Sequence, residues 1–235
     1  MVERKRSCLI LAAAAACLLL LGCSRDSPDK EQRNSPQPSS SAAPAPQTPA
    51  DNRPVIVAFG DSLTAGVAGR SYPDDLQDLL DQHGYRYRVE NQGVSGDTTT
   101  DGLARIDNVI ADHPALVILE FGGNDGLRGL PVESTRNNLT EMIERLKKAN
   151  IPLVLLGITL PPNYGPEYVK SFTAMYPELA KKYKLSYLPF LLLHVYRDSR
   201  LMQPDGIHPN GEGNRIVAQD VFRLIEPLLA RSGGR

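Results

Sequence analysis

The sequence holds a serine, a histidine and an aspartate in settings that suit nucleophilic catalysis. Ser62 stands in a Gly-Asp-Ser-Leu run, and His208 follows Asp205 by three residues in a turn that contains Gly206 and Pro209. A serine hydroxyl is a weak nucleophile until a base takes its proton, and that base needs a third group to fix its tautomer. We therefore expect Ser62 to be the nucleophile, His208 the general base and acid, and Asp205 the residue that orients His208.

Three further groups could stabilise the oxyanion that forms when a serine attacks a carbonyl group. The backbone N–H of Ser62 is one candidate. The N–H of Gly96 is a second, because a residue without a side chain lets the substrate come close. The side-chain amide of Asn124 is a third and does not titrate. Removal of one such donor typically lowers kcat by about 10²–10³-fold.

A metal site is the alternative for the same aspartate and histidine. Carboxylate and imidazole both bind metal ions, but the sequence offers no obvious further ligands near Asp205 and His208. We therefore expect no metal and no other cofactor. The other histidines have plainer settings: His83 stands at a helix end, His113 precedes a proline, and His194 lies in an apolar run where we expect a structural or partly buried side chain. Only His208 has a carboxylate at a plausible orienting distance.

Short apolar runs alternate with longer amphipathic runs from residue 54 to residue 235, which predicts one α/β domain with a parallel sheet and helices on both faces. The polar blocks described above follow strands or precede the last helix, where ligand sites of such sheets form. The expected strands are Val55–Phe59, Tyr87–Asn91, Leu116–Phe121, Leu153–Ile158 and Leu185–Leu188. The expected helices are Tyr72–His83, Leu103–Ala111, Val132–Lys148, Tyr168–Tyr183 and Gly211–Leu229.

The N-terminal residues 1–22 have the pattern of a signal peptide. Basic residues precede an apolar run from Cys8 to Leu21, which is shorter than the roughly 20 residues that a spanning helix needs. The run ends in Leu-Leu-Gly-Cys at Cys23 and resembles the lipobox of bacterial lipoproteins, which implies that Cys23 is lipidated. An ordinary secretory signal with an incidental cysteine is the alternative. All three cysteines lie in or beside this leader, so the rest of the chain has no disulfide framework.

Residues 23–53 read as the lipidated cysteine followed by a disordered tether. This segment is rich in proline, serine and alanine and has almost no large apolar residue, so it cannot bury enough surface to fold. A flexible segment of this length has a reach of roughly 30 Å. It would hold the domain just off a membrane surface.

Taken together, the Gly-Asp-Ser-Leu run at Ser62, Gly96, Asn124 and the Asp205-x-x-His208 pair resemble the GDSL or SGNH hydrolases. All four blocks occur in the family's order, from about Val55 to the C-terminus. The resemblance implies a flavodoxin-like three-layer α/β/α sandwich with a short, mostly five-stranded parallel sheet. It also implies the catalytic and oxyanion roles that the residue types suggest.

The match is closer to the bacterial periplasmic thioesterase I/lysophospholipase branch, which is also known as arylesterase. The segments from Gly122 to Gly129, Leu160 to Gly165 and Met202 to Asn210 carry this likeness. It implies a serine esterase that acts on acyl esters and possibly on thioesters or lysophospholipids. The branch also implies that two loops line the acyl site, and here these contribute Gly126, Leu127, Leu130, Leu160 and Pro161.

Two other functions stay open from the sequence. The first is an O-acetyl esterase that acts on envelope or extracellular glycans, and the second is a non-catalytic lipoprotein that binds lipid. The formal net charge of −1 gives no basic surplus for nucleic-acid binding. We expect a monomer in the bacterial cell envelope that faces the periplasm and is anchored through Cys23, with Ser24 favouring the outer membrane.

Overall fold

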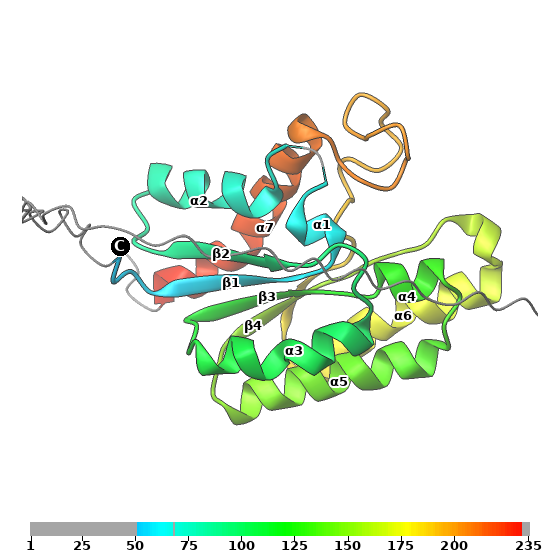
Figure 1. Cartoon of the computed structure of the whole chain (residues 1–235), viewed down its shortest axis with the longest axis horizontal. Coiled ribbons are helices and arrows are strands. Elements are labelled where there is room, and N and C mark those ends of the chain that lie inside the picture. The colour runs from blue at the N-terminus through cyan, green and yellow to red at the C-terminus, as the bar shows by residue number, and fades with distance from the viewer. Residues whose placement is uncertain (1–50, 68, 232–235) are drawn as a thin grey trace, which may run out of the picture. The chain divides into compact units, whose positions relative to one another are not determined.

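The computed structural model describes residues 51–67 and 69–231, and its centre is a five-stranded parallel sheet (Figure 1). The strand order is β2-β1-β3-β4-β5, and every pair of neighbours runs parallel. This is the flavodoxin-like order. The strands are β1 Val55–Gly60, β2 Arg88–Gly93, β3 Leu116–Glu120, β4 Leu153–Leu156 and β5 Ser186–Leu188.

The three central strands are buried on both faces. Every residue of β3 and β4 is buried, and so is all of β1 after Val55. Near-continuous apolar runs are typical of parallel strands with helices on both sides. The edge strands β2 and β5 carry polar residues and are only partly buried, so their sequence pattern is weaker.

Helices cover both faces of the sheet and complete a three-layer sandwich (Figure 1), which confirms the predicted fold class. The helices α2 and α7 pack against each other on one face, while α3 packs against α5, and α5 against α6, on the other. The bounds are α2 Tyr72–Gln82, α3 Thr99–Ala111, α5 Val132–Lys148, α6 Pro166–Tyr183 and α7 Gly211–Arg231.

Several boundaries differ from the sequence prediction. Helix α3 begins four residues earlier than expected, because Thr98 and Asp101 form a capping box at its start. Helix α6 begins at Pro166, since proline suits the first turn of a helix. Three short helices were not predicted at all: α1 Ser62–Ala65, α4 Gly123–Leu127 and the 3₁₀ helix η1 Pro162–Tyr164.

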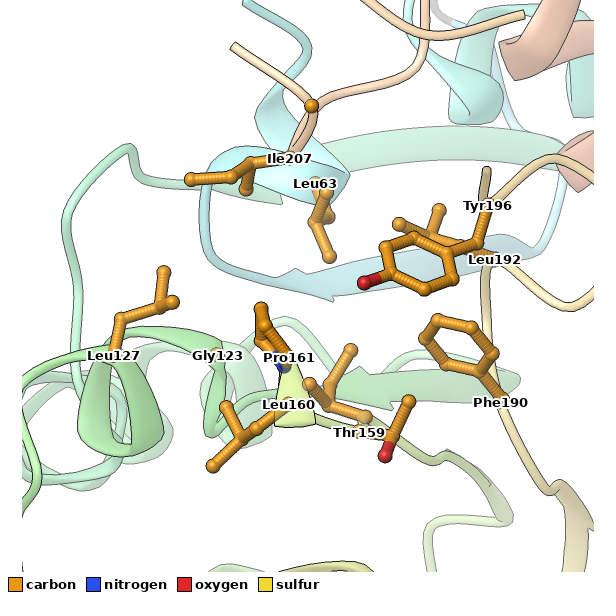
Figure 2. A pocket seen from close by; sticks show the side chains of 12 residues that line it. Leu63, Gly123, Leu127, Thr159, Leu160, Pro161, Phe190, Leu192, Tyr196 and Ile207 are labelled. Carbon is orange, nitrogen blue, oxygen red and sulfur yellow. The ribbon is translucent and has the colours of Figure 1, made fainter. Parts of the chain in front are cut away.

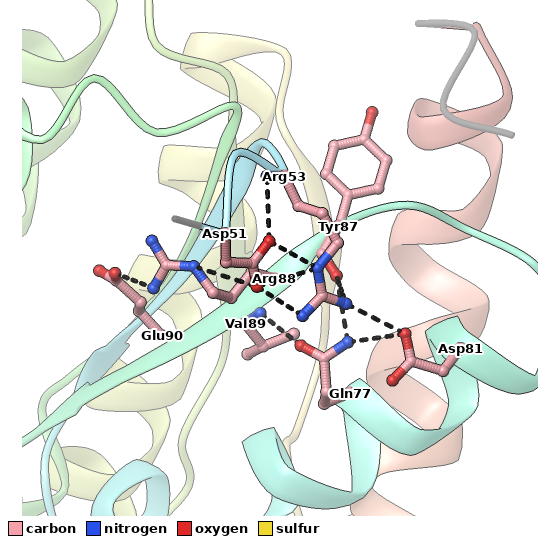
Figure 3. Close-up of polar contacts among 8 residues, drawn as sticks. All are labelled: Asp51, Arg53, Gln77, Asp81, Tyr87, Arg88, Val89 and Glu90. Carbon is pink, nitrogen blue, oxygen red and sulfur yellow. Dashed lines mark hydrogen bonds and ion pairs between the residues drawn. The ribbon is translucent and has the colours of Figure 1, made fainter. Parts of the chain in front are cut away.

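The start of the described chain is fastened to α2 and β2 (Figure 3). Arg53, which the sequence assigns to the tether, donates to Asp81 Oδ1 at 3.3 Å and to the carbonyl oxygen of Tyr87 at 3.1 Å. Gln77 on α2 donates to the same carbonyl and accepts the N–H of Val89 at 2.7 Å. These bonds occupy the N–H of Val89 in the edge strand β2 and the carbonyl of Tyr87 just before it.

The leader, Cys23 and the tether up to residue 50 lie outside the described residues. Within the part of the chain that is described, no helix has the length and hydropathy needed to span a bilayer.

Candidate active site

Ser62 is the first residue of α1, directly after strand β1. Asp61 caps this short helix, with its Oδ1 accepting the N–H of Leu63 at 3.0 Å. The turn from strand to helix is tight: a Cβ on Gly60 would lie 2.2 Å from the hydroxyl oxygen of Thr64. Glycine is therefore required at position 60, and the turn presents the Ser62 hydroxyl at the carboxyl end of the sheet.

Ser62, His208 and Asp205 form a continuous hydrogen-bonded chain. Ser62 Oγ lies 2.8 Å from His208 Nε2, and His208 Nδ1 lies 2.7 Å from Asp205 Oδ2. The His208 side chain is 18% exposed and that of Asp205 40%. The two partners of the histidine ring fix its orientation, so that Nε2 faces the serine. This is the arrangement that activates a serine nucleophile.

Asp205 is held as a carboxylate. Its second oxygen, Oδ1, accepts the backbone N–H groups of Ile207 at 2.9 Å and of His208 at 3.0 Å. Burial raises the pKa of Asp205, but hydrogen bonds from the His208 ring and these two N–H groups outweigh it and lower the pKa to about 2. The carboxylate is therefore ionised at any pH at which an imidazole can act as a base.

The side chain of Asn124 connects the loops after three strands. Asn124 lies in α4, after β3, and its Nδ2 donates to the Asp97 carbonyl at 2.9 Å and to Asp61 Oδ2 at 3.3 Å. Gly96 in the loop after β2 is exposed and has a φ of 89°, a conformation that disfavours side chains. A Cβ there would meet no atom of the described residues within 4 Å. Backbone conformation, rather than space within the protein, therefore requires this glycine.

An apolar pocket opens beside the triad (Figure 2) and contains about 460 Å³ of space, its open mouth included. Leu63, next to the nucleophile, and Ile207, next to the base, both lie in its wall. Phe190 and Tyr196 close the end opposite Leu127 (Figure 2), with ring centroids 5.6 Å apart. The other lining residues are Gly123, Ile158, Thr159, Leu160, Pro161, Leu192 and Gly206.

Three of the five residues predicted to line the acyl site are in the pocket wall, namely Leu127, Leu160 and Pro161. Gly126 and Leu130 are not. Gly126 lies behind the wall, where a Cβ would be 2.4 Å from a methyl carbon of Leu160. Leu130 is past the end of α4, and its carbonyl accepts the hydroxyl of Tyr168 at 2.6 Å. Gly126 is part of helix α4 and Leu130 follows its end, in a segment for which the sequence predicted a loop.

The expectation of a partly buried His194 was wrong, and so was the expectation that only His208 has a carboxylate beside it. Its side chain is 57% exposed, and its Nδ1 lies 2.7 Å from Asp220 Oδ2, while Arg223 donates to the other oxygen of Asp220. His208 is therefore not the only histidine with a carboxylate partner. Asp220 stands 26 residues further on, in α7, so the pairing was not visible in the local sequence.

Arg105 is a structural part of the site that sequence reasoning missed. From α3 it donates to Asp97 Oδ2 at 2.8 Å and to the carbonyl oxygens of Gln92 and Gly60 at 2.8 and 3.0 Å. Its guanidinium also lies over the ring of Phe59, 4.3 Å from the centroid. Arg105 thus joins the ends of β1 and β2, and its position in an amphipathic helix gave no hint of this.

The described residues contain no group of three or more histidine, cysteine, aspartate or glutamate side chains that could hold a metal ion. Asp205 and His208 bond to each other instead. Asp125, which the sequence places among the loops, is buried and accepts the N–H and the hydroxyl of Thr99 and the hydroxyl of Thr135. It ties the start of α3 to α4 and α5.

Comparison with known proteins places this site in a family. The model of the GDSL-like Lipase/Acylhydrolase family matches residues 58–216. Esterase TesA of Pseudomonas aeruginosa is 39% identical over 178 residues, which are 74% of this chain and 89% of the relative. Thioesterase 1/protease 1/lysophospholipase L1 of Escherichia coli is 38% identical over 178 residues, which are 74% of this chain and 84% of the relative.

Solved structures agree with this relationship. The crystal structure of TesA superposes with a TM-score of 0.71 at 38% identity and covers 74% of this chain and 99% of its own. The structure of esterase EstA from Pseudoalteromonas sp., inhibited by monoethylphosphonate, gives a TM-score of 0.70 at 32% identity, with 75% and 98% covered.

The chain belongs to the GDSL-like lipase/acylhydrolase family. It is a carboxylic ester hydrolase, an acyl esterase of the GDSL type.

Proposed function

We propose that this esterase works through an acyl-enzyme on Ser62, with His208 as general base and acid and Asp205 as its orienting partner. One observation carries the proposal: the unbroken Ser62–His208–Asp205 chain, at 2.8 and 2.7 Å, opens onto an apolar pocket. The site thus combines a nucleophile and its base with an adjacent apolar pocket that can hold an acyl chain.

The chemistry follows from the geometry. His208 Nε2 takes the proton of Ser62 Oγ as the oxygen attacks the ester carbonyl, and Asp205 stabilises the imidazolium that results. His208 then gives that proton to the leaving alcohol. Water attacks the acyl-enzyme with His208 again as base, and the acid is released.

Asn124 has a specific role in this scheme. Both hydrogens of its Nδ2 can be occupied in the free enzyme, by Asp97 and by Asp61. The longer bond, to Asp61 at 3.3 Å, is the weaker one. We infer that the transition-state oxyanion takes over this donor, together with the N–H groups of Ser62 and Gly96, so that the interaction strengthens as the reaction proceeds.

The pocket favours an ester with an acyl chain of several carbons. Each methylene group that a substrate buries in an apolar wall contributes about 0.8 kcal/mol, which is about fourfold in kcat/KM per carbon. An acetyl group would leave most of this wall uncovered. An O-acetylated glycan is therefore only the second candidate substrate. The name of the E. coli relative includes thioesterase and lysophospholipase, and the acyl chains of thioesters and lysophospholipids suit the apolar pocket.

A chain-length series tests this assignment. We expect kcat/KM for p-nitrophenyl esters to rise from acetate to butyrate and hexanoate, and Ser62→Ala to abolish turnover of all of them. Ser171→Ala, at an exposed position of α6, is the matched control and should keep full activity. Turnover of acetate alone would overturn the acyl-chain assignment in favour of the acetyl esterase.

We further propose that the enzyme is a monomeric lipoprotein, held through Cys23 in the cell envelope with the domain on the periplasmic side. The lipobox-like sequence and the proline-rich segment after it support this. In cells fed a clickable palmitate analogue, the wild type should be labelled and found in the outer-membrane fraction. Cys23→Ser should lose the label and the membrane association, and label that persists in this variant would refute the proposal.

A further inference from the structure

A glutamate is buried directly beside the nucleophile turn and has no part in the triad. Glu120 is the last residue of β3 and is 0% exposed. Its Oε2 accepts the backbone N–H of Asp61 at 3.2 Å and the hydroxyl of Thr64 at 2.9 Å. Its Oε1 is buried without a hydrogen-bond partner among the described residues.

Asp61 is the second carboxyl group of this pair and is itself 1% exposed. Its two oxygens hold parts of the site, because Oδ1 accepts the N–H of Leu63 and Oδ2 the amide of Asn124. Two adjacent buried carboxyl groups do not both ionise. One of the two therefore keeps a proton, and the other is the carboxylate that can accept hydrogen bonds with a full negative charge.

The contacts assign the proton to Glu120. An ionised Glu120 would bury its charge with one oxygen lacking any donor, which is unfavourable. Burial, and then the charge of Asp61, raise the pKa of Glu120 well above its usual range. Burial also raises the pKa of Asp61, to about 6, but the hydrogen bond from the N–H of Leu63 opposes this rise. Asp61 is therefore the more acidic member.

No lysine or arginine among the described residues is paired with Glu120. Tyr72 and Tyr176 are buried nearby, and burial raises the pKa of each phenol, so both are neutral. Arg105 approaches through the Gly60 carbonyl but is paired with Asp97. The groups that act on Asp61 from other elements are His208, which favours its charge, and Asp125, which opposes it.

We propose that Glu120 is a positioning residue, kept as the neutral acid, whose Oε2 holds the Asp61 N–H so that the Asp61 carboxylate keeps Asn124 and the Ser62 turn in place. It acts through Asp61 and touches no reacting atom. The proposal rests on the roles proposed for Ser62 and Asn124, whereas its protonation state can be measured without reference to activity.

Replacement of Glu120 by leucine and by glutamine separates the two parts of the proposal. Glu120→Leu removes the acceptor for the Asp61 N–H and for the Thr64 hydroxyl, and should lower kcat about 10- to 100-fold with little change in KM. Glu120→Gln carries the same acceptor and a donor in place of the acidic hydrogen, and should recover kcat to within about threefold of the wild type. A glutamine variant as slow as the leucine variant would overturn the proposal.

The pH dependence of stability gives the second test and needs no substrate. Between the ordinary pKa of an unfolded glutamate and the raised pKa of the folded Glu120, only the folded chain keeps the proton, so stability falls as pH rises. Glutamine does not titrate, so it makes no pH-dependent contribution to stability. The Tm of Glu120→Gln should therefore gain on the wild type as pH rises above 5, by about 3–5 °C for each pH unit up to the raised pKa of the folded Glu120.

The exposed Glu167 on α6 provides the control, as Glu167→Gln removes a carboxyl group without a buried partner. Its Tm relative to the wild type should stay nearly constant over the same range. A Tm difference for Glu120→Gln that is equally flat would show that Glu120 is ionised in the folded protein and would overturn the proposal. If the difference rises but Ser62→Ala stays active, the protonation state stands and the proposed mechanism fails.

Discussion

Removal of the Asn124 amide should slow the chemical step without preventing substrate binding. In the free enzyme this amide bonds to the Asp97 carbonyl at 2.9 Å and to Asp61 Oδ2 at 3.3 Å. In the transition state it would donate to an oxyanion, in a site where such a bond is strong. Loss of one oxyanion donor corresponds to about 2.7–4 kcal/mol, so Asn124→Ala should lower kcat by about 10²–10³-fold.

Asn124→Ala should also lower the free energy of unfolding, and the assay must separate this effect from the loss in kcat. Loss of a hydrogen bond to the buried Asp61 should destabilise the fold by about 1.5–3 kcal/mol, or roughly 3–12 °C in Tm. Asn138→Ala is a matched control, because the Asn138 amide also makes two bonds, to the hydroxyls of Thr99 and Thr100 at 3.0 Å each. It should lose stability but keep kcat within about threefold.

The measurement is steady-state hydrolysis of p-nitrophenyl butyrate at a temperature at which both variants are folded by circular dichroism. Asn124→Ala should show the loss in kcat, with KM changed by less than about threefold, because the donor acts mainly on the transition state. A fall in kcat of less than tenfold in a folded Asn124→Ala would refute the role of this amide, and so would an equal fall in Asn138→Ala.

Three further predictions concern pH, specificity and the framework of the site. Asp205 has a pKa of about 2, so it adds stability that is lost only as pH falls below about 4; Asp205 therefore stays ionised throughout the rise of kcat/KM that a histidine base requires, and a flat profile from pH 5 to 8 would exclude such a base. Phe190→Ala removes half of the aromatic pair that closes the pocket, and should move the preferred acyl chain two or more carbons longer in the p-nitrophenyl series, while an unchanged optimum would place the chain elsewhere. Arg105→Met removes the donor to Asp97 and to the carbonyls of Gln92 and Gly60 and should lower the unfolding free energy by about 2–4 kcal/mol in urea titrations; a change below 0.5 kcal/mol would contradict a role of Arg105 in joining β1 and β2.

The strands in the middle of the sheet could be predicted from the sequence because they are almost entirely apolar. Strands β3 and β4 are buried throughout, so each appears as an uninterrupted apolar run. Helix α5 matched its predicted bounds, Val132–Lys148, since its apolar residues repeat at helical spacing. The short helices α1 and α4 were missed because no such repeat exists in four or five residues. Local features at their starts define them instead, namely the cap from Asp61 and the left-handed conformation of Gly122.

The site shows the same division between local and distant information. Ser62, Asp205 and His208 could be named because their spacing and neighbours are local signals. Glu120 could not, because in sequence it is only the polar end of the run Leu116–Glu120. Its contact with Asp61 spans 59 residues and depends on the register that sets β3 beside β1. A carboxylate at the end of a fully buried strand was the one available hint.

The most direct test of the account is to identify the residue that a phosphonate ester modifies. A p-nitrophenyl alkyl phosphonate reacts with an activated serine and stops at a stable adduct that resembles the tetrahedral intermediate. The account predicts one adduct per chain, located by peptide mass spectrometry on Ser62, with activity lost in proportion and no adduct in Ser62→Ala or His208→Ala. An adduct on another residue, or a Ser62→Ala variant that still turns over p-nitrophenyl butyrate, would contradict it.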